Sequence, residues 1–174
     1  IVIENGIPRQ YVKKIKSRKF KLKNIKLHKK YIIYVSNFAK NKGHDNILKN
    51  LKNFSKYNIL LVGSVLDIYG KYIRDKLSKH KNITIINSVS EDQKYKLIKN
   101  SEFVIFPSNY EGYGIPIIEA LICDKNILVN KIPCLSHFKG CDRIKFVHFN
   151  KTFNFKNIIW AQNKRVKNNN KMEF

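Results

Sequence analysis

Short apolar runs alternate with longer amphipathic stretches over most of the chain. The runs are brief and rich in Ile, Val, Leu and aromatic residues, as in strands buried on both faces of a parallel sheet. They predict strands at residues 31–35, 59–62, 83–86, 103–106 and 127–129, and a weaker strand at 145–148. The amphipathic stretches predict helices at residues 45–54, 68–79, 91–100 and 115–122. This alternation predicts an α/β fold with a doubly wound parallel sheet.

Two of the predicted helices begin with local signals. Ser90 is followed three residues later by Gln93, which fits a capping box. Pro116 stands in the first turn of its helix, where the missing N–H needs no partner within the helix. A last helix at about residues 155–162 precedes a polar tail, which we expect to fray.

The chain of 174 residues has a formal net charge of +23, which suggests binding to nucleic acid. Only five of its 35 basic residues are Arg, the side chain preferred for two-point contacts with phosphate and guanine. Lys, Asn and Ile are abundant together, and their A/T-rich codons would produce the same charge through coding bias. Nucleic acid is therefore not expected as a partner, and a basic nucleic-acid-binding protein is kept as a third hypothesis.

The basic charge is densest in residues 13–30, which hold ten Lys or Arg among eighteen positions. This segment is interpreted either as a patch facing anionic lipid headgroups or as a solvated face. Cys123, Cys134 and Cys141 form no C-x-x-C pair, so we expect free thiols in a reducing cytoplasm. No run is long and apolar enough to predict a membrane span. Because the sequence starts without Met, we expect a part of a longer protein.

The loops that follow strands are the places where a doubly wound sheet binds ligands. Lys42 and Gly43 follow the first predicted strand, Gly63 follows the second, and the run P-S-N-Y-E-G-Y-G-I-P follows the fourth. Lys42 can face a phosphate, and Gly63 allows a close approach of the backbone. The last loop leads directly into a helix, whose first N–H groups favour an anion. We therefore expect a diphosphate at this helix start.

Two carboxylates bracket this helix start. Glu111 precedes the helix and Glu119 lies within it, while Gly112 and Gly114 lack side chains that would block a ligand. A carboxylate accepts two hydrogen bonds, which suits the vicinal diols of a nucleotide-sugar. We assign Glu119 to the ribose and Glu111 to the transferred sugar, where its charge would stabilise a developing oxocarbenium ion. The alternatives are a helix-dipole acid for Glu119 and a solvated loop acid for Glu111.

Together these residues resemble the C-terminal, donor-binding domain of GT-B glycosyltransferases of the large retaining family 4 type, also called glycosyl transferases group 1. The resemblance runs from N-G-I at residues 5–7 through K-G, L-L-V-G-S and I-N-S-V-S-E-D-Q to F-P-S-N-Y-E-G-Y-G-I-P-I-I-E-A-L and about Val129. The pattern of Glu, seven residues and Glu is its most specific part. The resemblance implies a Rossmann-like fold that forms one lobe of a GT-B enzyme.

The resemblance also implies roles for single residues. Glu111 looks like the donor-sugar Glu and is the catalytic candidate, Glu119 looks like the ribose ligand, and Lys42 matches the phosphate-binding Lys. Val89 matches the segment where the base packs, with a plain core position as the alternative. The loop whose backbone meets the sugar and phosphates corresponds to Gly112, Tyr113 and Gly114.

The sequence departs from the family pattern at three places. The usual Arg, five residues before the Lys, is Asn37 here, which removes a cation from the diphosphate, and Lys40 is a candidate replacement. The Gly-x-Pro after the helix of the second Glu is replaced by D-K-N at residues 124–126. The later Pro-Glu loop reads P-C-L-S-H at residues 133–137, where His137 is a minor binding candidate.

The expected function is that of the donor-binding half of a retaining glycosyltransferase, which moves a hexose from a nucleotide-sugar to a glycan or lipid-linked acceptor. No cofactor or metal is expected, because no D-x-D motif is present to bind a cation. The resemblance implies a missing N-terminal lobe with the acceptor site, so this chain alone is expected to be largely inactive. A non-catalytic nucleotide-sugar-binding module is the alternative. The expected location is cytoplasmic, with peripheral contact with an anionic membrane at the inner face.

The expected organisation has three parts. Residues 1–30 form an interlobe linker and basic segment, residues 31–150 form the nucleotide-sugar-binding Rossmann-like domain, and residues 151–174 form a C-terminal helix and polar tail.

Overall fold

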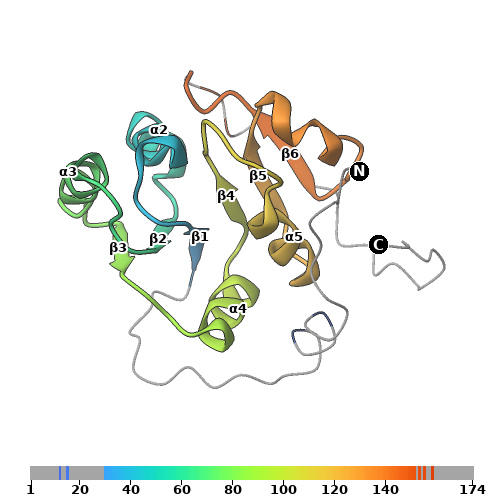
Figure 1. Ribbon diagram of the computed structural model, residues 1–174, viewed down its shortest axis with the longest axis horizontal. Coiled ribbons are helices and arrows are strands. Elements are labelled where there is room, and N and C mark those ends of the chain that lie inside the picture. The colour runs from blue at the N-terminus through green and yellow to red at the C-terminus, as the bar shows by residue number, and fades with distance from the viewer. Residues whose placement is uncertain are drawn as a thin grey trace.

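A parallel sheet of six strands organises the chain in the computed structural model (Figure 1). The structure describes residues 12, 15, 30–151, 153, 155 and 158. Each predicted strand is present, with bounds within one residue of those expected. The strands are β1 (Tyr31–Val35), β2 (Asn58–Val62), β3 (Ile83–Ile86), β4 (Val104–Phe106), β5 (Ile127–Asn130) and β6 (Ile144–Val147).

Four α-helices and three 3₁₀ turns connect the strands. The helices are α2 (His44–Lys49), α3 (Ile68–Leu77), α4 (Glu91–Asn100) and α5 (Ile115–Ile122), and the turns are η1 (Lys40–Lys42), η2 (Leu51–Phe54) and η3 (Pro133–Phe138). The predicted capping box is confirmed at the start of α4: the Gln93 N–H donates to Ser90 Oγ, and the Ser90 N–H donates to Gln93 Oε1. The predicted last helix and the basic segment fall almost wholly on residues outside the described part.

The helix predicted at residues 45–54 is wrong in its second half, because α2 ends at Lys49 and η2 follows. The buried Asn50 side chain explains the break. Its Nδ2 donates to Asn46 O at 3.0 Å, the carbonyl that a continuing helix would pair with the Asn50 N–H, and to Phe149 O at 2.8 Å. The Asn50 N–H donates instead to Ile47 O, one residue closer in sequence. The chain therefore tightens into a 3₁₀ turn.

The strand order is β3-β2-β1-β4-β5-β6, with all pairs parallel. The direction of winding reverses between β1 and β4. Since crossovers between parallel strands are right-handed, reversing the direction moves the helices to the other face. Accordingly, α2 and α3 lie on one side of the sheet and α4 and α5 on the other (Figure 1). The predicted doubly wound fold is confirmed.

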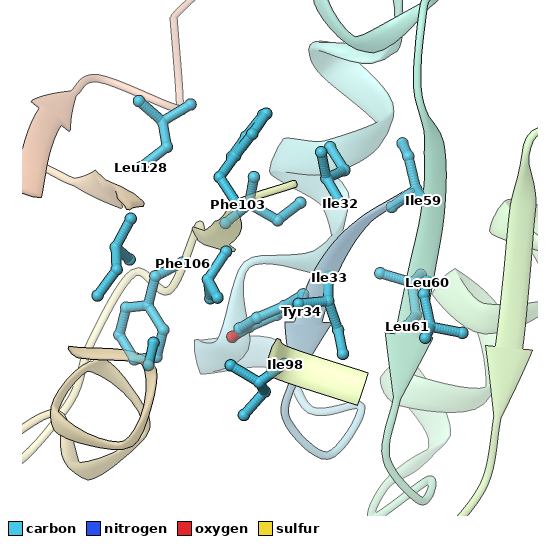
Figure 2. Packing of buried hydrophobic residues seen from close by; sticks show 14 of the residues in the cluster. Ile32, Ile33, Tyr34, Ile59, Leu60, Leu61, Ile98, Phe103, Phe106 and Leu128 are labelled. Atoms are coloured by element: carbon cyan, nitrogen blue, oxygen red, sulfur yellow. The ribbon is translucent and has the colours of Figure 1, made fainter. Parts of the chain in front are cut away.

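The core fills both faces of the central strands. Ile32, Ile33 and Leu61 are fully buried, as expected for strands covered by helices on both sides. Figure 2 shows Ile32 and Ile33 between Phe103 and Phe106 on one side and β2, which carries Leu61, on the other. Burying one such aliphatic side chain contributes about 1.5–3 kcal/mol. This packed base supports the loops that leave the carboxyl ends of β1 and β4.

Candidate functional site

The loops after β1 and β4 meet where the strand order reverses. In doubly wound sheets this switch point is the usual ligand crevice. The Asn46 side chain joins the two loops, since its Nδ2 donates to Pro107 O at 3.0 Å and to Asn109 Oδ1 at 2.8 Å. The Asn109 N–H in turn donates to Asn41 O at 2.9 Å. The two loops therefore form one unit at their bases.

Gly43 permits this close approach. Its φ of +64° lies in the left-handed region, and a Cβ there would stand 2.1 Å from Pro107 O. Any other residue would push the loops after β1 and β4 apart. At Gly43 the loops after β1 and β4 therefore approach each other closely, backbone against backbone.

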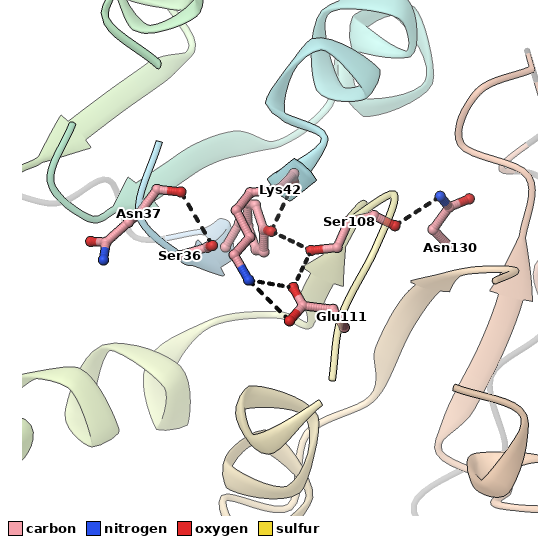
Figure 3. A network of polar contacts seen from close by, with 7 residues as sticks. Ser36, Asn37, Lys42, Ser108, Glu111 and Asn130 are labelled. Carbon is pink, nitrogen blue, oxygen red and sulfur yellow. Dashed lines mark hydrogen bonds and ion pairs between the residues drawn. The ribbon is translucent and has the colours of Figure 1, made fainter. Parts of the chain in front are cut away.

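Lys42 and Glu111 face each other across this junction (Figure 3). Lys42 Nζ lies 2.9 Å from Glu111 Oε1 and 3.0 Å from Oε2. The side chains are 26% and 11% exposed, respectively, so the pair is partly screened from water. The structure thus joins the predicted phosphate cation and the predicted sugar carboxylate in one ion pair.

Ser108 and Tyr34 support this ion pair from below. Ser108 Oγ donates to Glu111 Oε1 at 2.7 Å, and the Tyr34 hydroxyl lies 2.8 Å from Ser108 Oγ and donates to Lys42 O at 2.9 Å. Burial raises the pKa of Tyr34, so its hydroxyl stays neutral and able to donate. Asn130 Nδ2 donates to Ser108 O from the end of β5 (Figure 3). The position of Glu111 is therefore set by side chains of two strands, β1 and β5, as well as by its own loop.

His44 is buried beside this network, and neither of its ring nitrogens has a hydrogen-bond partner among the residues that the structure describes. Its ring stacks on Phe38 with centroids 4.2 Å apart and lies 5.0 Å from the Tyr34 ring. Burial, and secondarily the charge of Lys42, lower the pKa of His44 to about 3. The imidazole is therefore neutral near pH 7 and packs as a buried aromatic ring against Phe38 and Tyr34.

The two glycines of the loop before α5 differ in their surroundings. Gly114 has φ +83°, and a Cβ there would stand 2.9 Å from Leu135 Cδ2, whereas a Cβ at Gly112 would meet open space. Tyr113 stacks on His137 with ring centroids 4.9 Å apart, and His137 Nε2 lies 3.2 Å from Tyr113 O. The candidate His137 thus contacts the predicted sugar-binding loop.

The start of α5 offers fewer donors than a general helix N-terminus. Pro116 has no N–H, and the Ile117 N–H donates to Gly114 O at 2.8 Å. Within the described part of the chain, no side chain forms a capping hydrogen bond at this end of the helix. The backbone N–H groups of residues 112–115 are therefore the remaining candidates to donate hydrogen bonds to an anion at this helix start.

Glu119 occupies a different setting from Glu111. It is the fifth residue of α5 and is only 7% exposed. Its Oε1 accepts hydrogen bonds from Lys94 Nζ at 2.7 Å and from the Tyr95 hydroxyl at 3.0 Å, both on α4. Lys94 Nζ also lies 2.9 Å from Glu91 Oε1. Glu119 lies beyond the first turn of α5, so the alternative of a first-turn dipole acid does not describe it.

Comparison with known proteins decides the family. The model for glycosyl transferases group 1 matches residues 15–159. The chain belongs to this family. Curated relatives include the capsular polysaccharide biosynthesis glycosyltransferase CapH of Staphylococcus aureus, 32% identical over 106 residues, and an uncharacterized 41.2 kDa protein in the cps region of Klebsiella pneumoniae, 26% identical over 107 residues. These matches cover 56% and 60% of this chain but only 29% and 28% of the relatives.

Solved structures of similar fold agree with this assignment. WaaG, a glycosyltransferase involved in lipopolysaccharide biosynthesis, superposes with a TM-score of 0.56 at 14% identity, over 82% of this chain and 38% of that one. An apo structure of OtsA gives a TM-score of 0.63 at 12% identity, over 86% and 40%. Sucrose-phosphate synthase from Thermosynechococcus elongatus gives 0.60 at 18% identity, over 68% and 32%. The expected fold, one Rossmann-like lobe of the GT-B type, is confirmed.

Three further family candidates have protein contacts of their own. Asn37 is exposed, and its Oδ1 accepts the Ser64 N–H at 3.0 Å, which holds the loops after β1 and β2 together. A Cβ at Gly63 would stand 2.0 Å from Ser36 O, so its close approach is to backbone. Val89 is half-buried against the core, in keeping with the alternative of a core position. Lys40, the candidate replacement cation, is exposed on η1.

Sequence reasoning missed the side chains that support the two carboxylates. Ser108 lies in the quoted run, three residues before Glu111, and its spacing could have indicated the contact. Lys94 and Tyr95 carry no such signal, because they reach Glu119 across 25 and 24 residues. Their pairing follows from the packing of α4 beside α5.

The described residues contain no group of three or more His, Cys, Asp or Glu side chains that could hold a metal ion. In that same part of the chain, no helix has the length and apolar character needed to cross a membrane.

Proposed function

We propose that this chain is the donor-binding half of a retaining glycosyltransferase that takes a hexose from a nucleotide-sugar. The observation that carries the proposal is the Lys42–Glu111 pair, with Nζ to oxygen distances of 2.9 and 3.0 Å, at the switch point between β1 and β4. Membership of the group 1 family supports it.

The charges of this pair match those that develop when the donor breaks. Cleavage of the bond between the sugar and the diphosphate leaves positive charge on the sugar and negative charge on the leaving group. A carboxylate at Glu111 would stabilise the first, and the Lys42 ammonium, with the N–H groups of residues 112–115, would stabilise the second. Lys42 and Glu111 contact each other in this structure. A bound donor would therefore replace this contact, with its diphosphate beside Lys42 and its sugar beside Glu111.

The remaining parts of the donor have candidate positions. Glu119 is assigned to the ribose, Val89 to the neighbourhood of the base, and the backbone of Gly112, Tyr113 and Gly114 to the sugar and phosphates. The proposed acceptor is a glycan or lipid-linked saccharide, and likeness to a capsule-biosynthesis glycosyltransferase supports polysaccharide biosynthesis as the setting. Acceptor binding belongs to the proposal for the whole protein, and turnover by these 174 residues alone is expected to be poor.

Donor binding can be tested by calorimetric titration with UDP-, GDP- and ADP-glucose. At least one should bind, and Lys42→Met should weaken that binding tenfold or more, because it removes a charge-assisted contact with the diphosphate. Glu119→Ala should also weaken it. Lys52→Met is the matched control, since Lys52 is an exposed cation on η2, which leads into the amino end of β2 rather than into the site. Absence of binding to all three sugars would exclude the donor-site proposal for this chain.

The proposed location is cytoplasmic, at the inner membrane face, with the basic segment at residues 13–30 contacting anionic lipid. Co-sedimentation with vesicles containing phosphatidylserine should retain the chain at low salt and release it at high salt. Equal retention by purely zwitterionic vesicles would contradict this part of the proposal.

A further inference from the structure

The Glu119 carboxylate is held by one oxygen only. Lys94 Nζ and the Tyr95 hydroxyl both bond to Oε1, at 2.7 and 3.0 Å. Among the described residues none donates to Oε2, although an ionised carboxylate accepts about four hydrogen bonds. The side chain keeps 9% of its surface exposed. One oxygen is thus fixed by protein while the other is left for a further donor.

The two donors hold this oxygen from adjacent positions on one helix. Successive residues of an α-helix project about 100° apart, so Lys94 and Tyr95 approach Oε1 from different directions. Lys94 itself is fixed by Glu91, 2.9 Å away at the start of the same helix. Burial alone would lower the pKa of Lys94, but the hydrogen bonds and charges of Glu119 and Glu91 outweigh it and raise that pKa. Lys94 therefore remains a cation beside the Glu119 carboxylate.

We propose that Lys94 and Tyr95 are positioning residues that orient Glu119 so that Oε2 recognises the hydroxyls of the donor's ribose. The inference rests on the donor site proposed above and adds the residues that would make this site select ribose. An oxygen already saturated by protein cannot rotate toward the ligand, so selection of ribose falls to Oε2 alone. If Lys94 and Tyr95 served only to pack α4 against α5, replacing either one would lower the affinity for all nucleotides by the same factor.

The test compares ribonucleoside diphosphates with counterparts that lack the ribose hydroxyls. UDP, GDP and ADP, and their 2′,3′-dideoxy forms, are titrated against the wild-type chain and three variants. Wild type should bind one ribonucleotide about tenfold or more tightly than its dideoxy form, since hydrogen bonds to a charged group discriminate by at least that factor. Tyr95→Phe and Lys94→Met should reduce the ratio to within about threefold, while affinity for the dideoxy form stays near the wild-type value.

Lys96→Met is the matched control, because Lys96 lies on the same helix and makes none of the contacts to Glu119, so its ratio should equal that of wild type. An unchanged ratio in Tyr95→Phe, with both affinities lowered equally, would show a merely structural role and overturn the inference while leaving the donor site intact. Wild type binding both forms equally would also overturn it. Binding of no nucleotide would overturn the donor site itself. If Lys94→Met fails to fold, the nearly isosteric Tyr95→Phe decides alone.

Discussion

Glu111 and Glu119 are eight residues apart in the sequence, yet they are held in opposite ways. Glu111 lies on a loop, and Lys42 from another loop contacts both of its oxygens. Glu119 lies on a helix, and two residues of the neighbouring helix bond to one of its oxygens. The partner of Glu111 is itself a candidate ligand-binding residue, whereas the partners of Glu119 are not.

The difference indicates that the Lys42–Glu111 ion pair can be replaced by contacts with a ligand, whereas the Lys94–Glu119 ion pair holds Glu119 in place. Lys42 and Glu111 are the more exposed couple, so a charged ligand can displace either from the other at modest cost. Lys94 and Glu119 are 14% and 9% exposed, and separating them would leave the buried Glu119 carboxylate without a cation. The first arrangement suits the part of the site where charge changes during transfer. The second suits a part that must keep one geometry.

The largest expected effect is on stability when each carboxylate is removed. Glu119→Ala should lower the free energy of unfolding by about 2 kcal/mol, because it removes the buried partner of Lys94 and leaves that cation only the exposed Glu91. Glu111→Ala should lower it by about 1 kcal/mol, since Lys42 can turn toward water. Urea denaturation followed by circular dichroism measures both. Equal losses would erase the distinction between the two settings.

The Glu111 side should be the acid-sensitive one, because His44 lies beside it with a pKa lowered to about 3 by burial and then by Lys42. In the unfolded chain the His44 ring takes up a proton below about pH 6.5. Stability is therefore fully present above that pH and lost as pH falls toward 3, at up to about 1.4 kcal/mol per pH unit. His44→Phe should flatten this slope between pH 6 and 4, and His148→Gln, an exposed His, should not. An unchanged slope in His44→Phe would show that the ring titrates freely.

The Glu119 side should be sensitive to alkali, with a smaller effect. Burial, followed by the charge and hydrogen bond of Glu119, raises the pKa of Tyr95. The folded chain then keeps a proton that the unfolded chain loses above about pH 10, so stability is present below that pH and declines above it. Tyr95→Phe should decline less than wild type by about 1 kcal/mol between pH 10 and 11. Tyr110→Phe, at a tyrosine that is 68% exposed, is the control and should follow wild type.

Sequence reasoning located the strands and the glycine loop because their signals are local. Apolar runs define each strand, and the run from Glu111 to Glu119 spans one loop and one helix. The end of α2 could not be predicted, because the Phe149 carbonyl that holds Asn50 lies 99 residues away. The contacts of Lys94 and Tyr95 with Glu119 could not be predicted for the same reason. Helices α4 and α5 become neighbours only because of the strand order in the sheet, and no sequence motif links Lys94 to Glu119.

The junction formed by Gly43 and Asn46 has a consequence for engineering. Because the loop after β1 is pressed against Pro107 and bonded to Asn109, neither loop can change length or path without moving the other. Residues 36–43 and 107–114 therefore constitute a single cassette despite their separation in the chain. A graft meant to alter donor choice should take both segments from one relative, since a hybrid of two parents would bring together loops whose backbones collide.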